Sequence, residues 1–494
     1  MRFVLGIDTS TTASKALLLD ETGRIVGVAS TEHTHSRPHP LWSEQDPAEW
    51  WTAVATSVRR VLSESNIDPL SVHAVGLTGQ MHGLVLLSAD GRVLRPAMLW
   101  NDGRSSAQCD AMRARIGHDR LVDLTGNDAF TGFTAPKLLW VRDCEPDVYA
   151  RVGHILLPKD YIRWRLTGEF ATDKAGAGGT LLLNLTTRDW SDDLLHALDI
   201  PRAWLPNTFE GPEVTGYVTA SAADSTGLRA GIAVVAGAGD QAAQAVGVGA
   251  VVPDVWALTL GTSGVVFAPC AQPHVAQRGS AHAFPHAVPG QWHMMGVMLS
   301  AAGSLAWYLD MMTANVDVEA LLDEAARVSI GCEGLTFLPY LTGERTPHAD
   351  PLARGAFVGL TARHGRGHLT RSVLEGVACG LRDNAQLLRA AGLPPPLQLR
   401  ISGGGARSAL WRQIIADILD LELAVVQTEE GAAFGAALLA GMGVGFWPSV
   451  EQACGDTVRT KTDAKPQAAS TYDAVYDRFR SLYPALVPYY RAVS

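Results

Sequence analysis

The chain has 494 residues, of which 47% are hydrophobic and only 18% charged, so it can bury substantial cores and is not intrinsically disordered. This length excludes a single small domain and predicts two large ones. The 40 Lys and Arg residues against 50 Asp and Glu leave a formal net charge of −10, which argues against a general binder of nucleic acid. Phosphate ligands stay compatible with this charge, because backbone amides, helix N-termini and metal ions can hold them.

Cysteine usage and the apolar segments bear on the compartment. The six cysteines are far apart and form no C-x-x-C pair, so neither a zinc ribbon nor a disulfide framework is indicated. The apolar run over residues 3–7 is too brief for a signal peptide. The strongest membrane candidate, Met294 to Leu309, is shorter than the roughly 20 residues that span a bilayer and predicts a buried helix. We therefore expect a cytoplasmic protein without a membrane partner.

Apolar runs of strand length alternate with helical patterns from residues 3–7 to residues 397–401, which predicts α/β layers. Asp46-Pro47-Ala48-Glu49 is typical of a helix start. The spacing of apolar residues over 472–482 predicts an amphipathic helix that packs on a domain. Residues 441–470 are rich in Gly, Pro, Thr and Lys without periodicity, which indicates an irregular connection.

Two segments share the pattern of strand, hydroxyl-rich turn and strand. One surrounds Ser10-Thr11-Thr12, and the other surrounds Gly261-Thr262-Ser263. When the two turns are aligned, Asp8 falls opposite Thr259, so the carboxylate occurs in only one copy. A duplicated fold with one specialised half has this form. We therefore expect a first domain over residues 1–252, a second over residues 253–441, and a connection with a C-terminal helix over residues 442–494.

The hydroxyl-rich turns are candidate phosphate sites. Several N–H groups and hydroxyls of such a turn can point at one anion, and two facing turns would clamp a polyphosphate. Ser and Thr also favour turns for purely structural reasons, but the pattern recurs at the start of both halves. Asp8, where the first strand meets its turn, is suited to hold Mg²⁺ through water, because Mg²⁺ keeps much of its hydration and often takes one or two carboxylates.

A glycine-rich segment, Gly237-Ala238-Gly239-Asp240-Gln241-Ala242, follows the buried strand predicted over residues 232–236. It matches the dinucleotide pattern G-x-G-x-x-A, but Asp240 would stand where the pyrophosphate must lie, so a nicotinamide site is disfavoured. Asp240 is either an ordinary helix cap or a general base that the helix N-terminus keeps ionised. The residue pattern leaves both interpretations open.

Two further motifs are candidate ligand contacts. Gly403-Gly404-Gly405 follows a strand and opens a helix, which either lets the backbone lie flat against a nucleotide or simply makes a tight connection. Gln80-Met81-His82-Gly83 follows the strand-like stretch 74–77, at the predicted edge of a sheet, where α/β proteins bind ligands. His82 alone would more often be structural.

Other site classes receive little support. Pro285 between His282 and His286 argues against a helical metal site. The segment Gly261 to Val265 lacks the last Gly of a nucleophile elbow, and no G-x-x-x-x-G-K-[ST] loop occurs, so neither a serine hydrolase nor a P-loop kinase is indicated.

Several long motifs occur in order along the chain. They are Ser36 to Pro47 (SRPHPLWSEQDP), Leu99 to Arg104 (LWNDGR), Gly132 to Trp140 (GFTAPKLLW), Leu157 to Tyr161 (LPKDY), Gly343 to His348 (GERTPH) and Gly355 to Leu360 (GAFVGL). With the two hairpins, they resemble the FGGY family of carbohydrate kinases, within the actin-like ATPase superfamily, from Phe3 to about Gly441. The resemblance implies an α/β fold of two ribonuclease-H-like domains with the active site in the cleft between them, the sugar mainly on the first and ATP mainly on the second.

The resemblance also implies roles for individual residues. Asp240 would be the catalytic base, and Asp8 the acid linked to Mg²⁺ through water. The sugar would contact Gln80, Met81, His82, Asn101 and Asp240. The phosphates of ATP would lie near Thr11, Thr12, Lys15, Gly261 and Thr262, and the rest of the nucleotide near Gly403, Gly404 and Gly405. Two positions depart from the family pattern: Ser10, where the family commonly has Gly, and the residues after Asp173, which lack the usual Ser-Asp pair.

The motifs over residues 36–47, 79–83, 99–104, 157–161 and 343–348 are most similar to those of family members that phosphorylate D-xylulose. The resemblance therefore implies ATP-dependent conversion of D-xylulose to D-xylulose 5-phosphate. The alternatives are a family kinase for ribulose or glycerol, a nicotinamide-dependent dehydrogenase, and a non-catalytic sugar sensor, which the retention of both Asp8 and Asp240 disfavours. The implied partners are the sugar, ATP and Mg²⁺, and a homodimer is left open.

Overall fold

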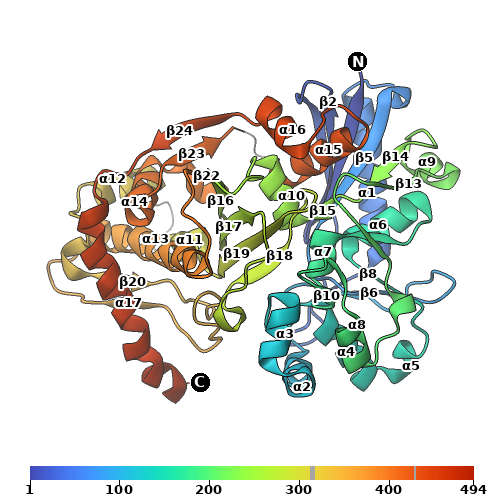
Figure 1. The fold of residues 1–494 in the computed structure, drawn as a ribbon. Coiled ribbons are helices and arrows are strands. Elements are labelled where there is room, and N and C mark those ends of the chain that lie inside the picture. Colours follow the sequence, from blue (N-terminus) through green and yellow to red (C-terminus); the bar gives the residue numbers. More distant parts are fainter. Residues whose placement is uncertain (312–316, 428–429, 494) are drawn as a thin grey trace.

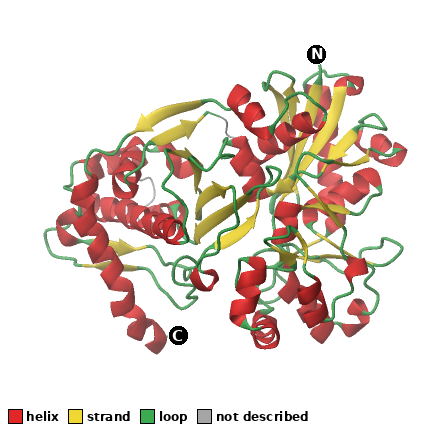
Figure 2. Ribbon diagram, in the orientation of Figure 1, coloured by secondary structure: helices red, strands yellow, loops and turns green. Residues whose placement is uncertain are grey.

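The computed structural model describes residues 1–311, 317–427 and 430–493. It contains two large mixed sheets in two lobes, with helices against the faces of each (Figures 1 and 2). The first sheet has the order β13-β14-β5-β1-β2-β3, and β15 also pairs with β5. Its strands are β1 (Phe3–Thr9), β2 (Ala13–Asp20), β3 (Ile25–Glu32), β5 (Val72–Gly79), β13 (Val214–Tyr217), β14 (Ala233–Val235) and β15 (Ala238–Gly239).

The second sheet has the order β18-β19-β17-β16-β22-β23-β24. Its strands are β16 (Val255–Leu260), β17 (Gly264–Cys270), β18 (His282–Pro285), β19 (Trp292–Met298), β22 (Gln398–Ser402), β23 (Leu423–Val426) and β24 (Thr460–Ala464). Short two-stranded sheets lie outside the two large ones. They contain β4 (Glu44–Gln45), β6 (Val85–Leu87), β7 (Ala97–Met98), β8 (His154–Leu156), β9 (Ala171–Asp173), β10 (Leu183–Asn184), β11 (Asp189–Trp190), β12 (Asn207–Phe209), β20 (Thr336–Leu338) and β21 (Ala356–Val358).

The helices of the first half surround the first sheet and its added subsheets. They are α1 (Pro47–Glu64), α2 (Ser106–Ile116), α3 (His118–Thr125), α4 (Thr134–Cys144), α5 (Pro146–Tyr149), α6 (Pro158–Thr167), α7 (Lys174–Gly178), α8 (Asp192–Leu198), α9 (Ala220–Thr226) and α10 (Asp240–Gly247). The later helices are α11 (Ala302–Met311), α12 (Val318–Ala326), α13 (Arg366–Ala390), α14 (Ala409–Leu419), α15 (Gly431–Gly443), α16 (Val450–Thr457) and α17 (Ala469–Ala492).

The two large sheets have the same connectivity pattern. Along β3-β2-β1-β5-β14-β13, the pairings run antiparallel, antiparallel, parallel, parallel and antiparallel. Along β19-β17-β16-β22-β23-β24, they run in the same sequence. The structure therefore confirms the duplicated α/β fold of two ribonuclease-H-like domains. Both predicted hairpins are present, β1–β2 and β16–β17, and each has its hydroxyl-rich turn between the strands.

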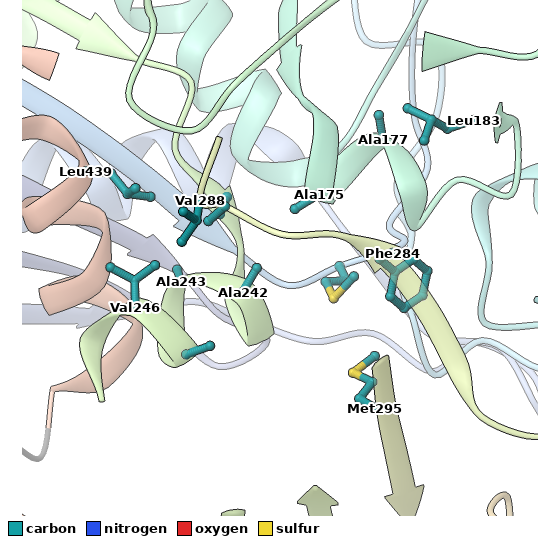
Figure 3. Packing of buried hydrophobic residues seen from close by; sticks show 14 of the residues in the cluster. Ala175, Ala177, Leu183, Ala242, Ala243, Val246, Phe284, Val288, Met295 and Leu439 are labelled. Carbon is teal, nitrogen blue, oxygen red and sulfur yellow. The ribbon is translucent and has the colours of Figure 1, made fainter. Parts of the chain in front are cut away.

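Two helices link the lobes. α10 lies against α15, and α15 in turn packs on β1 and β5 of the first sheet, although it follows β23 in the chain (Figure 1). Figure 3 shows Val246 and Ala243 of α10 and Leu439 of α15 among the buried residues of one apolar cluster. β1 and α15 approach each other so closely at Gly6 that an added Cβ would collide with the carbonyl oxygen of Ala433.

Two local expectations were wrong. Met294 to Leu309, expected as one buried helix, is divided between β19 and α11. Residues 441–470, expected to be irregular, contain α16 and β24. Both elements acquire their structure from tertiary contacts, since β24 is an edge strand paired with β23 and α16 packs on the distant helix α10 as well as on α15. Within the described ranges, no helix is both long enough and apolar enough to cross a bilayer.

Candidate active site

A cavity of about 220 Å³ lies between the two lobes. Its first-half lining comprises Ser10, Thr11, Met81, His82, Trp100, Phe130, Gly132, Phe133, Asp240 and Gln241. Its second-half lining comprises Ser263, Val265, Met295, Val297 and Arg345. We call this the first cavity. Its size and mixed aromatic and polar lining suit a small polar molecule such as a sugar.

A second cavity, of about 600 Å³, lies against the end of β22 and the glycine-rich turn that follows it. Its lining is Asp8, Asp240, Gln241, Gln244, Thr259, Ile401, Ser402, Gly403, Gly404, Ala406, Arg407, Arg412, Val425, Val426 and Ala432. Asp240 and Gln241 line both cavities. Asp240 therefore stands where the two spaces adjoin.

Asp240 is the first residue of α10 and follows the short strand β15. The turn before it requires Gly237, which has a φ of +68° and lies so close to Leu77 that a Cβ would collide with its carbonyl oxygen. Burial raises the pKa of Asp240 to about 7, the negative charge of Asp8 adds to the rise, and hydrogen bonds from Gln241 oppose it. A carboxylate with a pKa near neutrality is suited to accept a hydroxyl proton at neutral pH.

Asp8 is near the end of β1 and pairs across the hairpin with Lys15. Burial raises its pKa to about 6, Lys15 opposes that rise, and Glu430 adds to it. Lys15 is itself in an ion pair with Glu430. Asp8 Oδ1 is buried and has no hydrogen-bond partner among the described residues.

The donor set around Asp8 fits a hydrated divalent cation. Its oxygen is unsatisfied, it shares a cavity with Asp240, and its negative charge raises the electrostatic cost of ionising Asp240. A cation between them would relieve that cost, and Mg²⁺ typically takes one or two carboxylates and keeps water as its other ligands. The described ranges hold no cluster of three or more His, Cys, Asp or Glu side chains that could together bind a metal ion.

His82 presents a hydrogen-bond acceptor to the first cavity. Its backbone has a φ of +66°, and its Nδ1 lies 2.7 Å from the carbonyl oxygen of Gly179. Because that oxygen can only accept, Nδ1 carries the proton and Nε2 keeps its lone pair. Burial lowers the pKa of His82 to about 3, so the ring is neutral at physiological pH.

The backbone under His82 is held by α4. The Nζ of Lys137 donates to the carbonyl oxygens of His82 at 3.0 Å and Gly132 at 2.6 Å, and Thr134 Oγ1 also donates to His82 at 3.0 Å. Lys137 is fully buried, and burial lowers its pKa to about 7. A neutral amine retains two N–H donors, so both bonds survive deprotonation.

Gln80 supports the first turn instead of lining a cavity. Its Nε2 donates to Gln45 Oε1 at 3.0 Å, and its Oε1 accepts from Thr11 Oγ1 at 3.4 Å. Trp100 Nε1 donates to the same Thr11 hydroxyl at 3.0 Å. Asn101 is not brought to the first cavity: its Oδ1 accepts from Ser43 Oγ at 2.5 Å, and it lines a separate surface hollow formed mainly by residues 37–43.

The residues expected near the phosphates divide into two groups. Thr11, Gly403 and Gly404 line the cavities, and Lys15 lies beside Asp8. Thr12, Gly261 and Thr262 are in the two turns but line neither cavity. Gly261 and Thr262 are held against the start of α11, because their carbonyl oxygens accept from Ala302 and Ala301 respectively.

Gly405 packs against the apolar core of the second domain and does not line the second cavity. An added Cβ there would lie 2.7 Å from Leu260 and 3.1 Å from Trp411. Gly403 has a φ of +94°, a left-handed conformation that favours glycine at this turn. The turn therefore presents Gly403 and Gly404 to the second cavity, while Gly405 contacts the buried side chains of Leu260 and Trp411.

Several lining residues were not singled out from the sequence. They include Phe130, Phe133, Gln241, Gln244, Met295, Val297, Arg345 and Arg412. Gln241 carries a local signal, because it follows the candidate base directly. Arg345 stands inside the motif Gly343 to His348, but no local pattern shows that this loop reaches a cavity in which Asp240 also lies.

Comparison with known proteins gives family matches on both sides of the cleft. Residues 3–247 match the N-terminal domain, and residues 256–444 the C-terminal domain, of the FGGY family of carbohydrate kinases. Over 488 residues the chain is 44% identical to xylulose kinase of Escherichia coli strain K12, covering 98% of this chain and 99% of that one.

Solved structures of proteins described as xylulose kinases also resemble this chain over its whole length. A protein from Brucella ovis described as a xyloylose kinase has a TM-score of 0.92 at 41% identity, covering 100% of both chains. The ligand-bound xylulose kinase from Lactobacillus acidophilus has a TM-score of 0.95 at 27% identity, again over 100% of both chains.

Proposed function

Because this chain belongs to the FGGY family of carbohydrate kinases, we propose that it transfers the γ-phosphoryl group of ATP to the terminal 5-hydroxyl of D-xylulose. The products are D-xylulose 5-phosphate and ADP. The similarity to xylulose kinases over nearly the whole chain supports this sugar.

The observation that carries the proposal is the position of Asp240. Asp240 lines both the small polar cavity and the larger cavity beside the Gly403–Gly404 turn. A hydroxyl bound in the first and a phosphate bound in the second would meet at this group. That arrangement is what in-line phosphoryl transfer to an alcohol requires.

The residues then take distinct roles. Asp240 accepts the proton of the attacking hydroxyl, and the Nε2 lone pair of His82 accepts a hydrogen bond from another sugar hydroxyl. Met81 and Trp100 supply apolar contact, while Thr11 lies at the phosphate end. The nucleotide occupies the second cavity against Gly403 and Gly404, where the exposed turn allows close approach of the backbone.

ATP would be bound with Mg²⁺, and Asp8 is the residue that would hold the ion, with Asp240 as neighbour. When bound, the ion neutralises charge on the phosphate oxygens. The proposed sugar-binding domain is residues 1–252 and the proposed nucleotide-binding domain is residues 253–441. Residues 442–494 form a C-terminal segment that adds β24 to the second sheet and ends in α17. We place the protein in the cytoplasm, a location that its six free cysteines support.

A panel of acceptors tests the proposal. ADP release is measured with D-xylulose, D-ribulose, L-ribulose, L-xylulose, glycerol and no acceptor. D-Xylulose should have the highest specificity constant, and the product should be the 5-phosphate by NMR. A higher specificity constant for L-ribulose or glycerol would leave the family standing and overturn the sugar assignment. No release with any acceptor, with sugar binding retained, would favour a sensor.

A further inference from the structure

The first cavity contains one cationic side chain for which the proposed chemistry gives no role. Arg345 is the only Lys or Arg among the described residues that line it. Its guanidinium makes no hydrogen bond or ion pair with any described residue, and its ring contact is with Phe130, 5.9 Å away. A guanidinium carries five N–H donors and no acceptor, so these donors are available to a ligand in the cavity.

The chain on both sides of Arg345 is tied down. Glu344 Oε1 accepts from the backbone N–H of Arg345 at 2.7 Å and of Leu299 at 2.9 Å. On the other side, Thr346 N–H donates to the carbonyl oxygen of Val297 at 3.1 Å, and Val297 N–H donates to Thr346 Oγ1 at 3.2 Å. Because Val297 itself lines the cavity, the loop presents Arg345 from a position fixed to β19.

Arg345 lies near Gly132 and close enough to His82 and His282 for its charge to act on both rings. An ideal Cβ on Gly132 would be 3.9 Å from its guanidinium. Its positive charge helps to lower the pKa of His82 and of His282, whereas the charge that shifts the pKa of Asp240 is that of Asp8. A sugar with its reacting hydroxyl at Asp240 therefore extends toward His82 and Arg345.

The hydrogen-bonding character of these two side chains is complementary to an open-chain ketose. His82 Nε2 can only accept, so it needs a hydroxyl, whereas Arg345 can only donate, so it needs an acceptor. In an open-chain ketopentose, the C2 carbonyl oxygen accepts hydrogen bonds and, unlike the hydroxyl oxygens, carries no proton that needs an acceptor. Among its oxygens, the carbonyl is the one that a donor-only group satisfies completely.

We propose that Arg345 is a specificity-determining residue that donates to the carbonyl oxygen of the open-chain ketose and so selects ketoses over the corresponding polyols. This inference rests on the proposed function and names a contact from the second domain to the sugar. The residue acts in binding, and no bond to it forms or breaks.

The test compares D-xylulose with xylitol and D-arabinitol, in which the carbonyl is reduced to a hydroxyl. Specificity constants are measured for wild type, Arg345→Met and Arg345→Lys. Arg345→Met should lower the constant for D-xylulose by roughly one to two orders of magnitude, the range expected for a lost hydrogen bond to a charged group. The constants for the two polyols should fall several-fold less, so the ketose-to-polyol ratio falls. Arg345→Lys should restore part of the ratio, because it keeps the charge but loses the planar fork.

The matched control is Arg363→Met, on an exposed arginine of the same domain that pairs with Glu333. It should leave the ratio unchanged. If Arg345→Met lowers the constants for ketose and polyols by the same factor, its effect is on the loop as a whole and the inference is overturned. If the wild type itself phosphorylates polyols as well as D-xylulose, the inference is overturned while a sugar-kinase activity stands. If the wild type releases no ADP with D-xylulose, the proposed function fails, and this inference with it.

Discussion

Lys137 donates a hydrogen bond to the carbonyl oxygen of His82 at 3.0 Å. The same ammonium group donates to Gly132 at 2.6 Å, so one buried side chain fixes two backbone segments of the first cavity. His82 adopts a left-handed conformation, with a φ of +66°, which an L residue with a side chain adopts at a cost. Lys137 is therefore a positioning residue for His82.

Lys137→Met should weaken both folding and sugar binding. It leaves the buried carbonyl of Gly132 without this donor, so the free energy of unfolding should fall by about 1–3 kcal/mol. The KM for the sugar should rise, while the Kd for ATP stays unchanged. Urea unfolding and steady-state kinetics measure the two effects. Thr134→Val, which removes the other donor to His82 but leaves Gly132 paired, is the control and should have the smaller effect on stability.

The lowered pKa of Lys137 also predicts how the stability of the protein varies with pH. Its pKa is lowered by burial to about 7 in the folded state, against about 10.4 for an unperturbed lysine. Between these values, the unfolded chain holds one more proton than the folded chain, so stability rises with pH. The wild type should therefore gain stability relative to Lys137→Met from about pH 7 toward pH 10. A difference between the two proteins that stays constant over that range would contradict the lowered pKa.

Asp240→Asn should abolish phosphoryl transfer while the protein stays folded and binds sugar. General-base catalysis typically contributes about 10² to 10⁴ in rate, and an amide cannot accept the proton. Turnover, circular dichroism and sugar titration separate these quantities. Near-normal turnover in the variant would remove Asp240 from the mechanism.

The elevated pKa of Asp240 predicts how sugar binding varies with pH. With a pKa of about 7, the carboxylate accepts a hydrogen bond from a sugar hydroxyl only above this range. Calorimetric titration without nucleotide or metal should show binding that strengthens as pH rises through 7. In Asp8→Asn the midpoint should move to lower pH, because the repulsion between the two carboxylates is lost. An unmoved midpoint would show that burial alone sets the pKa.

Asp8→Asn should raise the concentration of Mg²⁺ needed for activity and depress turnover more than sugar binding. The buried Oδ1 of Asp8 has no partner among the described residues, and an amide is a weaker ligand for a hard cation. Rates over a magnesium titration at saturating sugar measure the effect. An unchanged magnesium dependence would count against this role.

The sequence predicts best what depends on neighbours in the chain. The two hairpins, the capped start of α1 and the positions of Asp8 and Asp240 at strand ends all follow from local pattern. The packing of α15 on the first sheet does not, because the helix is apolar on all sides and its pattern carries no sign of which surface it covers. Asn101 shows a second limit of prediction from sequence. A motif identifies the residue, but tertiary contacts direct its amide toward Ser43 and away from the first cavity.

His82 provides the last prediction, because its tautomer is fixed by the carbonyl oxygen of Gly179. His82→Ala removes the Nε2 acceptor, so the KM for D-xylulose should rise by roughly tenfold, whereas the Kd for ATP should not change, since His82 lines only the first cavity. His82→Gln can place an amide oxygen as acceptor and should recover part of the loss. Because burial holds the pKa of His82 at about 3, its contribution should be the same from pH 5 to pH 9. A loss in His82→Ala that is large at neutral pH and vanishes near pH 5 would mean that the ring titrates in the site, and it would contradict the neutral acceptor.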